Sequence, residues 1–470
     1  MKKIILPLLI FHSLNFLCQK AGINFSYIDS SANPRNDFYT FCNGKWQKTF
    51  VLPESDARYG SFNEINNNNL KNIKIILDNA SKNNTAAPNS NAQKLRDFYN
   101  SAMDSIALDK MGYGPIKGQL AAIDKVKDLN ALISLKPTLD FDGVTLFFGG
   151  SVSIDPKNSK RNLFGISQAG LGLGERDYYY GPQFGMIRTE YIKYLSELFS
   201  LIGVEKDQSV RNAKLVFEVE SNMADKALTR LEMRDPEKLY NLYSPKTLSE
   251  LAPSINWEIY FKEKKVKQPD TIIVSTVAYI KQLSSILATT PIENLKLYAK
   301  AQLLMEAAPF LSSKFEEVTF AFRGKILSGA KQMKPRWERV QTSMDKVMGD
   351  IVSEEFVKKH FTPKAKAKLN SLIDNLILAY RDRIASRTWM DETTKKQANR
   401  KLDLLIRKVG YPEKWKDYSK LNIVPDNYWA NYSRGVRYNV EDNLGDLKKP
   451  ADRTKWQMTP VTVNAYYDPT

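Results

Sequence analysis

Histidine and cysteine are almost absent from this sequence, which has two residues of each type among 470. The histidines, His12 and His360, are far apart, so no helix can present two of them one turn apart. A zinc site needs three or four nitrogen, sulfur or oxygen ligands in fixed geometry, and a histidine pair commonly supplies two of them. We therefore expect no zinc bound to this chain. A Ser/His/Asp triad would have to use His360, which lies in KKHFTPK just before a helix start and is interpreted as a surface or packing residue.

Long apolar runs are also scarce. The basic start MKK is followed by an apolar stretch from Ile4 to Leu17, which suits a signal peptide and is too short to span a bilayer comfortably. We predict a signal peptide over residues 1–21 and an exported protein that is periplasmic, extracellular or membrane-tethered. Cys18 suggests a lipid tether, although the large residue before it does not suit a lipobox, and a cut near Ala21 or Gly22 is the alternative. A membrane is expected to contact the protein only through such a tether.

With Cys18 in the leader, the mature chain keeps only Cys42, so no intrachain disulfide is expected. A hydrophobic content of 43% and a length of 470 residues instead allow a sizeable core. The net charge of +17 raises the question of a nucleic-acid partner. Lysine and arginine are spread along the chain with acidic neighbours, as in KLRDFYNSAMDSIALDK, so we interpret the charge as a solvated surface and expect no nucleic acid.

The remaining pattern predicts a mainly α-helical protein with a small β insert. Apolar residues recur at helical spacing over about 63–77, 91–104 and most of 181–410. The segments GVTLFFGGSVSIDP and NLFGISQAG alternate or cluster apolar residues between turn formers, which indicates a β-hairpin or small sheet. The turn-rich GLGLGERD that follows lacks the Lys-Ser/Thr pair of a phosphate-binding loop.

Two helices are expected between Thr362 and Gly410. Thr362-Pro363 is an N-cap followed by a first-turn proline, and Asp391 can cap the second helix. Gly410 is a candidate for the left-handed residue that ends that helix. The apolar stripes predicted on the two helices are Leu369, Leu372, Ile373, Leu376, Tyr380 and Ile384 on the first, and Ala398, Leu402 and Leu405 on the second.

Six segments resemble, in the same order, the N-terminal part of the neprilysin-like zinc endopeptidases. They are NDFYTFCNGKW, RYGSF, GLGLGERDYY, FRGKILSGAKQMKPRWERV, WMDETTKKQANRKLDLLIRKVGYPEKWKDYS and PADRTKWQMTPVTVNAYY. The resemblance implies a large helical cap domain of a two-domain gluzincin-type peptidase. In that family the cap and a thermolysin-like catalytic domain enclose a chamber that admits oligopeptides. The zinc motif H-E-x-x-H follows the Asn-Ala-Tyr/Phe motif by some tens of residues, and zinc is the cofactor of the full-length family.

By this resemblance, the domains are a helical domain at 33–412, a connection at 413–459 and the first strand of a truncated catalytic domain at 460–470. Asn464 and Ala465 match residues that pair with the substrate main chain, and an extended edge strand can do so whatever the substrate's side chains are. Tyr466 would line the non-prime side of the cleft. The alternative for all three is a plain strand in a sheet.

The segment RYGSFNEIN carries two further positions of the resemblance. Arg58 matches an arginine that receives a substrate's C-terminal carboxylate, and Phe62 matches a wall of the apolar pocket beside the scissile bond. The sequence departs from the family at Asn66, often a second arginine, and at Asn63, often acidic. It also departs at Asn43, where animal relatives carry a bridging cysteine. The first two departures weaken the expectation that dipeptides are released.

Two functions follow. The first is the N-terminal part of a secreted zinc metalloendopeptidase that acts on oligopeptides and lacks the zinc-binding region, with a separately encoded catalytic half as a partner. The second is a non-catalytic peptide-binding or interaction module derived from such a peptidase. If the first function is correct, a truncated reading frame explains why the sequence stops within TPVTVNAYYDPT.

Overall fold

The computed structural model describes residues 24–267 and 269–470, so the predicted signal peptide lies outside the described residues. The chain divides into two compact units, Met1–Glu54 and Ser55–Thr470. The first unit contains η1 (Phe25–Tyr27) and α1 (Phe38–Thr49). An extended passage follows α1.

In the first unit, Asp29 links the start of the described chain to α1. Its carboxylate accepts a hydrogen bond from Lys48 Nζ at 2.7 Å and from Ser31 Oγ at 2.6 Å. These bonds, that from Lys48 foremost, hold the pKa of Asp29 well below its usual range. Trp46 stacks on Phe50 with ring centroids 4.7 Å apart.

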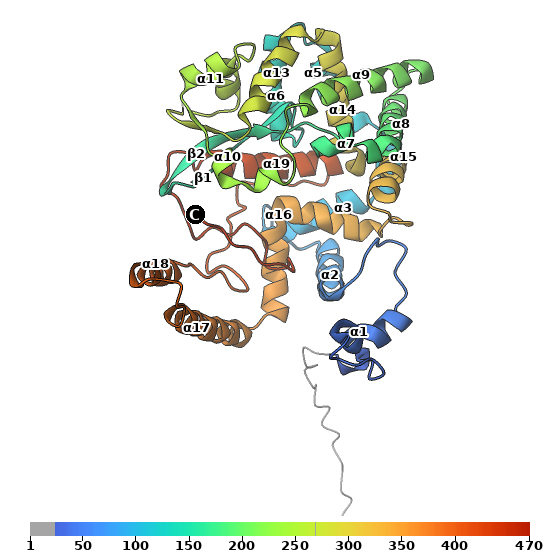
Figure 1. Cartoon of the computed structure of the whole chain (residues 1–470). Coiled ribbons are helices and arrows are strands. Elements are labelled where there is room, and N and C mark those ends of the chain that lie inside the picture. Colours follow the sequence, from blue (N-terminus) through green and yellow to red (C-terminus); the bar gives the residue numbers. More distant parts are fainter. Residues whose placement is uncertain (1–23, 268) are drawn as a thin grey trace, which may run out of the picture. The chain divides into compact units, whose positions relative to one another are not determined.

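The second unit is mostly helical and includes one small sheet (Figure 1). Its α-helices are α2 (Ser61–Ser81), α3 (Asn91–Met103), α4 (Ser105–Met111), α5 (Lys117–Asp124), α6 (Leu129–Phe141), α7 (Arg176–Tyr180), α8 (Gly185–Leu201), α9 (Lys206–Ala224), α10 (Pro236–Leu239), α11 (Pro245–Leu251), α12 (Trp257–Glu263), α13 (Val277–Thr289), α14 (Ile292–Ala307), α15 (Ser313–Thr319), α16 (Arg336–His360), α17 (Pro363–Ala385), α18 (Glu392–Asp403) and α19 (Tyr428–Leu444). A π-helix, η6 (Phe320–Leu327), follows α15. The prediction of a mainly α protein with a small β insert is confirmed.

The sheet has the order β1-β2-β4-β3. β1 (Phe148–Asp155) and β2 (Asn158–Gln168) form the predicted antiparallel hairpin, with Val152 opposite Phe164. β4 (Ile272–Val274) runs parallel to β2, and β3 (Leu242–Tyr243) runs antiparallel to β4. These two strands lie within the region predicted to be helical, and they are too short to show an alternating pattern in the sequence.

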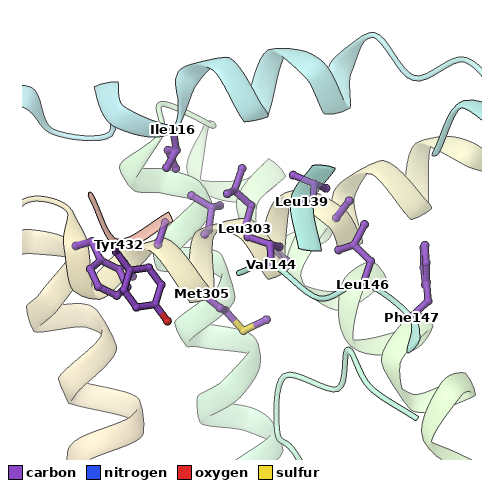
Figure 2. Packing of buried hydrophobic residues seen from close by; sticks show 14 of the residues in the cluster. Ile116, Leu139, Val144, Leu146, Phe147, Leu303, Met305 and Tyr432 are labelled. Carbon is purple, nitrogen blue, oxygen red and sulfur yellow. The ribbon is translucent and has the colours of Figure 1, made fainter. Parts of the chain in front are cut away.

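One continuous apolar core joins the sheet to helices from both ends of the unit. Figure 2 shows a part of it, with Ile116, Leu139, Val144, Leu146, Phe147, Leu303, Met305 and Tyr432 labelled. Leu303 and Phe147 are fully buried, and Phe147 stacks on Tyr298 with centroids 5.0 Å apart. Fully burying a side chain of this size contributes about 1.5–3 kcal/mol.

The core also encloses a charged cluster. Asp140 accepts hydrogen bonds from Lys136 Nζ at 2.9 Å and from Lys264 Nζ at 3.0 Å, and all three side chains are almost completely buried. The Lys136 ammonium also lies 4.4 Å from the centre of the Phe148 ring. Burial lowers the pKa of Lys136 to about 8, although the Asp140 charge opposes that shift. One carboxylate therefore balances two buried ammonium groups.

The segment 413–459, predicted as a connection, contains the helix α19. Trp429 and Tyr432 of this helix are buried in the core, and Phe310 stacks on Tyr432 with centroids 4.1 Å apart. α19 packs on α16, α3 and α6, so this segment is part of the same packed body. The domain boundaries drawn from the sequence stay a prediction.

α16 bends at Met348, whose φ of −149° and ψ of 35° are not helical (Figure 1). α17 and α18 follow the C-terminal end of α16. We call these two helices and the segment after them the arm (residues 363–409). Thr362 Oγ1 and Asp391 Oδ1 accept hydrogen bonds from the backbone N–H groups of Ala365 and Thr394, so both predicted caps are confirmed.

The end of the second arm helix differs from the prediction. α18 ends at Asp403, before Leu405, and the apolar residues 404–406 are exposed. Gly410 does adopt a left-handed conformation, with φ of 72°, but it turns the later connection. A Cβ at this position would lie 2.5 Å from the Phe361 ring. Within residues 24–267 and 269–470, no helix combines the length and apolarity needed to cross a membrane.

Candidate functional site

The C-terminal residues 456–470 form one wall of a cavity of about 880 Å³. Asn464, Ala465 and Tyr466 line this cavity and are exposed to solvent. The arm contributes Leu405, Ile406 and Lys408, and the hairpin contributes Val152 and Ile154. The structure thus brings together three of the predicted site residues, the arm and the sheet.

Two contacts fix the start of this C-terminal segment on the helical body. Thr459 Oγ1 donates a hydrogen bond to Asp345 Oδ1 of α16 at 2.9 Å, and Asn69 Nδ2 of α2 donates one to the backbone oxygen of Val461 at 3.4 Å. Val461 itself is buried. Burial raises the pKa of Asp345, although the bond from Thr459 acts in the opposite direction. The cavity wall is therefore anchored at residues 459–461 and exposed beyond them.

Residues 460–470 do not form the strand that the sequence predicted. The Asn464 side chain accepts a hydrogen bond from the Ala465 N–H at 2.8 Å, and the Asn464 N–H donates to Thr462 O at 3.0 Å. A strand is stable only when a neighbouring strand pairs with its backbone groups, and none lies alongside this segment in the described part of the chain. Local turns satisfy the backbone here instead.

Arg58 and Phe62 lie at the N-terminal end of α2. Both side chains are exposed, Phe62 to 63%, and Arg58 forms no ion pair with any described residue. The Gly60 N–H donates to Asn63 Oδ1 at 3.2 Å, so Asn63 caps the helix as an acidic residue would. α2 connects this end to the C-terminal segment, because Asn69 lies two turns beyond Phe62. Arg58 and Phe62 do not line the 880 Å³ cavity.

The described residues do not fit a zinc ion. No group of three or more His, Cys, Asp or Glu side chains in residues 24–267 and 269–470 is placed to hold a metal. His360 ends α16, is exposed, and lies against Phe356 with ring centroids 4.9 Å apart. We therefore derive no catalytic step through zinc from these residues.

A second, smaller pocket of about 300 Å³ was not predicted from the sequence. Its lining comprises Gly143, Val144, Thr145, Gly170, Leu171, Gly172, Leu173, Gly174, Gln302, Met305, Glu306, Arg323 and Leu327. The glycine-rich segment GLGLG and the π-helix η6 thus face one space. The glycines were the available signal, because closely spaced glycines mark a close approach of backbone to another group.

Glu220 lies beneath the glycine loop and is completely buried. It accepts hydrogen bonds from Tyr179 Oη at 2.8 Å, Tyr191 Oη at 2.9 Å and Gln302 Nε2 at 2.7 Å. Burial raises the pKa of the Glu220 carboxyl to about 7, although the two tyrosine hydroxyls act in the opposite direction. In the sequence this residue looks like any other helix glutamate.

The fold is that of a mainly helical domain with one small sheet. The sequence profile of peptidase family M13 matches residues 34–412, and the chain belongs to this family. A Mycobacterium tuberculosis zinc metalloprotease, Zmp1, solved in complex with an inhibitor, superposes with a TM-score of 0.91 at 32% identity, covering 95% of this chain and 68% of that one. The neprilysin-like resemblance of the sequence is thereby confirmed.

Curated relatives show the same relationship. Human endothelin-converting enzyme 1 is 27% identical over 465 residues, and Drosophila melanogaster neprilysin-3 is 27% identical over 472 residues. PepO from Lactobacillus rhamnosis, at 17% identity and a TM-score of 0.83, shares the fold. The chain spans about 60% of the length of the two curated relatives. M13 enzymes are zinc metallopeptidases.

Proposed function

We propose that this chain is the N-terminal part of a secreted zinc metalloendopeptidase that hydrolyses oligopeptides, with the zinc ligands supplied by polypeptide outside these 470 residues. The observation that carries this proposal is the M13 match over residues 34–412 together with the superposition on a zinc metalloprotease over 95% of the chain. The sequence itself contains no H-E-x-x-H motif, because its two histidines are His12 and His360.

In this proposal the chain holds and orients the peptide. The exposed backbone at Asn464 and Ala465 pairs with the main chain of an extended substrate, once the rest of the catalytic domain has made this segment a strand. Tyr466, which lines the same cavity, contacts substrate residues on the non-prime side. Arg58, which forms no ion pair with the described residues, offers a guanidinium fork to a terminal carboxylate, and Phe62 offers an exposed apolar face.

The arm supports the proposal of a catalytic half as partner. No residue between 363 and 409 is buried. Its exposed large apolar side chains are Leu369, Leu372, Leu376, Leu378, Tyr380, Trp389, Leu404, Leu405 and Ile406. Exposed apolar surface of this extent is typical of an interaction site. The arm also has twelve basic and five acidic residues, a net charge of +7, so a partner surface rich in carboxylates suits it.

The coding sequence downstream of Thr470 gives the most direct test. A continuing or neighbouring frame that encodes H-E-x-x-H is the expected result. The purified chain alone, incubated with mixed oligopeptides, should leave their mass spectra unchanged, because no described residues can hold a metal. A stop codon with no such frame nearby would instead favour a non-catalytic peptide-binding module. Metal-dependent cleavage by the chain alone would contradict the proposal that the zinc ligands lie outside these 470 residues.

Arg58→Ala tests substrate binding in the enzyme completed with its catalytic half. We expect kcat/KM to fall about tenfold to a hundredfold for short peptides with a free C-terminal carboxylate, because a charge-assisted hydrogen bond contributes roughly 1.5–3 kcal/mol. Amidated forms of the same peptides should change much less. An equal loss on free-acid and amidated peptides would show that Arg58 holds the fold and not the substrate.

A further inference from the structure

The 300 Å³ pocket presents two opposite charges that do not pair with each other. Arg323, on the π-helix η6, and Glu306, on α14, both line it, and no ion pair joins them among the described residues. Arg323 is accessible to solvent, and Glu306 is half-buried. Two opposite charges free to move would normally meet, since each gains a hydrogen-bonded counter-ion by doing so.

Packed aromatic residues lie beside both charged groups. Phe322, next to Arg323, is buried and stacks on Tyr194 with centroids 5.1 Å apart. On the other side, Tyr432 Oη donates a hydrogen bond to Glu306 Oε1 at 3.2 Å, and Tyr432 is itself stacked on Phe310. π-Helical turns are rare in proteins overall, but those that occur are often found at functional sites.

Both charged groups keep unused hydrogen-bonding capacity. Among the described residues, the Arg323 guanidinium is hydrogen-bonded to the Tyr194 hydroxyl and lies 4.0 Å from Met305 Sδ through Nη2; the Glu306 and Glu220 carboxyls act on its charge without forming an ion pair with it. A guanidinium has five N–H donors, so several remain for a ligand. Glu306 has a second carboxylate oxygen that accepts no hydrogen bond from the described residues.

The glycine loop forms a wall of the pocket without supplying its recognition groups. The Leu173 N–H donates to Tyr179 Oη at 3.1 Å, and the Gly174 N–H donates to Leu171 O at 2.8 Å. Gly172 lies so close to the layer beneath that a Cβ there would be 1.8 Å from Tyr191 Oη. Recognition of a ligand therefore depends on the side chains of Arg323 and Glu306.

We propose that this pocket binds a small zwitterion, a free amino acid or a dipeptide, with its carboxylate on Arg323 and its ammonium on Glu306. A cavity of about 300 Å³ is at the small end of ligand sites, which excludes a longer peptide. A neutral ligand would leave both charges without a hydrogen-bonded counter-ion, and a simple anion would be repelled by Glu306. The site is distinct from the 880 Å³ cavity, with which it shares no lining residue.

Calorimetric titration of the folded chain with alanine, Ala-Ala, N-acetyl-Ala-Ala and Ala-Ala amide tests this assignment without any substitution. We expect saturable binding of alanine or Ala-Ala, and the comparison of these two identifies which one fills the pocket. Each blocked peptide should bind at least about tenfold more weakly than Ala-Ala, because each lacks one charge-assisted interaction. Absence of saturable binding at millimolar concentrations, or equal binding of free and blocked forms, would overturn the proposal.

Paired variants assign each charge to its residue. In Arg323→Gln the advantage of Ala-Ala over Ala-Ala amide should disappear, and in Glu306→Gln the advantage over N-acetyl-Ala-Ala should disappear. The matched controls are Arg230→Gln and Glu237→Gln, whose side chains are 72% and 78% exposed and lie outside the pocket. Circular dichroism checks that each variant is folded. Equal weakening of all ligands by both pocket variants would indicate a structural role and contradict the assignment.

Discussion

The core and the arm of this protein are both helical, but they differ in what their apolar residues contact. In the core, leucines such as Leu303 are fully buried, and even charged residues are enclosed with their partners. In the arm, Leu372 and Leu376 repeat at helical spacing on α17 and are 54% and 50% exposed. An amphipathic pattern therefore identifies a helix in both regions, yet it does not reveal whether the surface that covers the helix lies in the same chain.

Removing a charged group should give the largest difference in stability loss between the core and the arm. Asp140→Asn leaves two buried ammonium groups without a counter-charge, and we expect it to lower the free energy of unfolding by about 3–5 kcal/mol. Glu392→Gln removes the partner of Lys395 in the arm, where the glutamate side chain is 90% exposed, and should cost less than about 0.5 kcal/mol. Urea unfolding at neutral pH measures both. Similar losses for the two variants would mean that the core cluster is hydrated and not enclosed.

The pH dependence of stability should also arise in the core. Between pH 4.5 and about 7, the folded chain keeps a proton on Glu220 that the unfolded chain has released. Stability therefore falls as pH rises through this window and levels off above it, with a contribution of about 3 kcal/mol at about 1.4 kcal/mol per pH unit. Tyr179, Tyr191, Gln302 and the Arg323 charge are the groups that face this carboxyl.

Glu220→Gln removes this titration, so the variant should show a smaller decrease in stability from pH 5 to pH 8 than the wild-type chain. The comparison uses urea midpoints of both proteins at the two pH values. Glu392→Gln in the arm serves as the control, and its pH dependence should match that of the wild type. An unchanged slope in Glu220→Gln would show that Glu220 is ionised throughout this range.

The smallest effect is expected for truncations in the arm. Leu372→Ala should change the free energy of unfolding by less than about 0.5 kcal/mol, because its side chain is already half exposed. Leu303→Ala, as the core reference, should cost about 2–5 kcal/mol through lost burial and a new cavity. If the arm binds a catalytic half, Leu372→Ala should weaken that association instead. A large loss of stability in the chain alone would show that the arm packs on itself in solution.

The same contrast explains what the sequence could predict. The caps at Thr362 and Asp391 and the β1–β2 hairpin depend on local residue choice, and they were predicted correctly. Strands β3 and β4 were missed because two or three residues carry no periodicity, and α19 because its aromatic residues resemble a connecting segment. The extended C-terminal strand was predicted, but its formation needs a partner strand.

The candidate sites were predictable to a different extent. Arg58, Phe62 and Asn464 to Tyr466 came from a resemblance to a family, and the structure places them on exposed surfaces without testing their roles. The Arg323 and Glu306 pocket could not be predicted, because the two residues come from different helices and only the fold brings them to one space. The burial of Lys136, Asp140 and Glu220 was also missed, because a helix sequence does not show which of its polar residues the fold encloses.

The bend in α16 has a geometric consequence for the arm. Met348 is 12 residues from His360, so at a rise of about 1.5 Å per residue the last part of the helix extends roughly 18 Å beyond the bend. A change of about 10° at Met348 would therefore displace the start of the arm by roughly 3 Å. The backbone at Gly349, next to the bend, is closely packed, since a Cβ there would lie 2.5 Å from Asp345 Oδ1 and 2.7 Å from Thr459 Cγ2. The hydrogen bond between Thr459 and Asp345 lies on the other side of the bend from the arm, so a movement about Met348 would shift the cavity lining at Leu405, Ile406 and Lys408 while the anchor at Thr459 stayed in place.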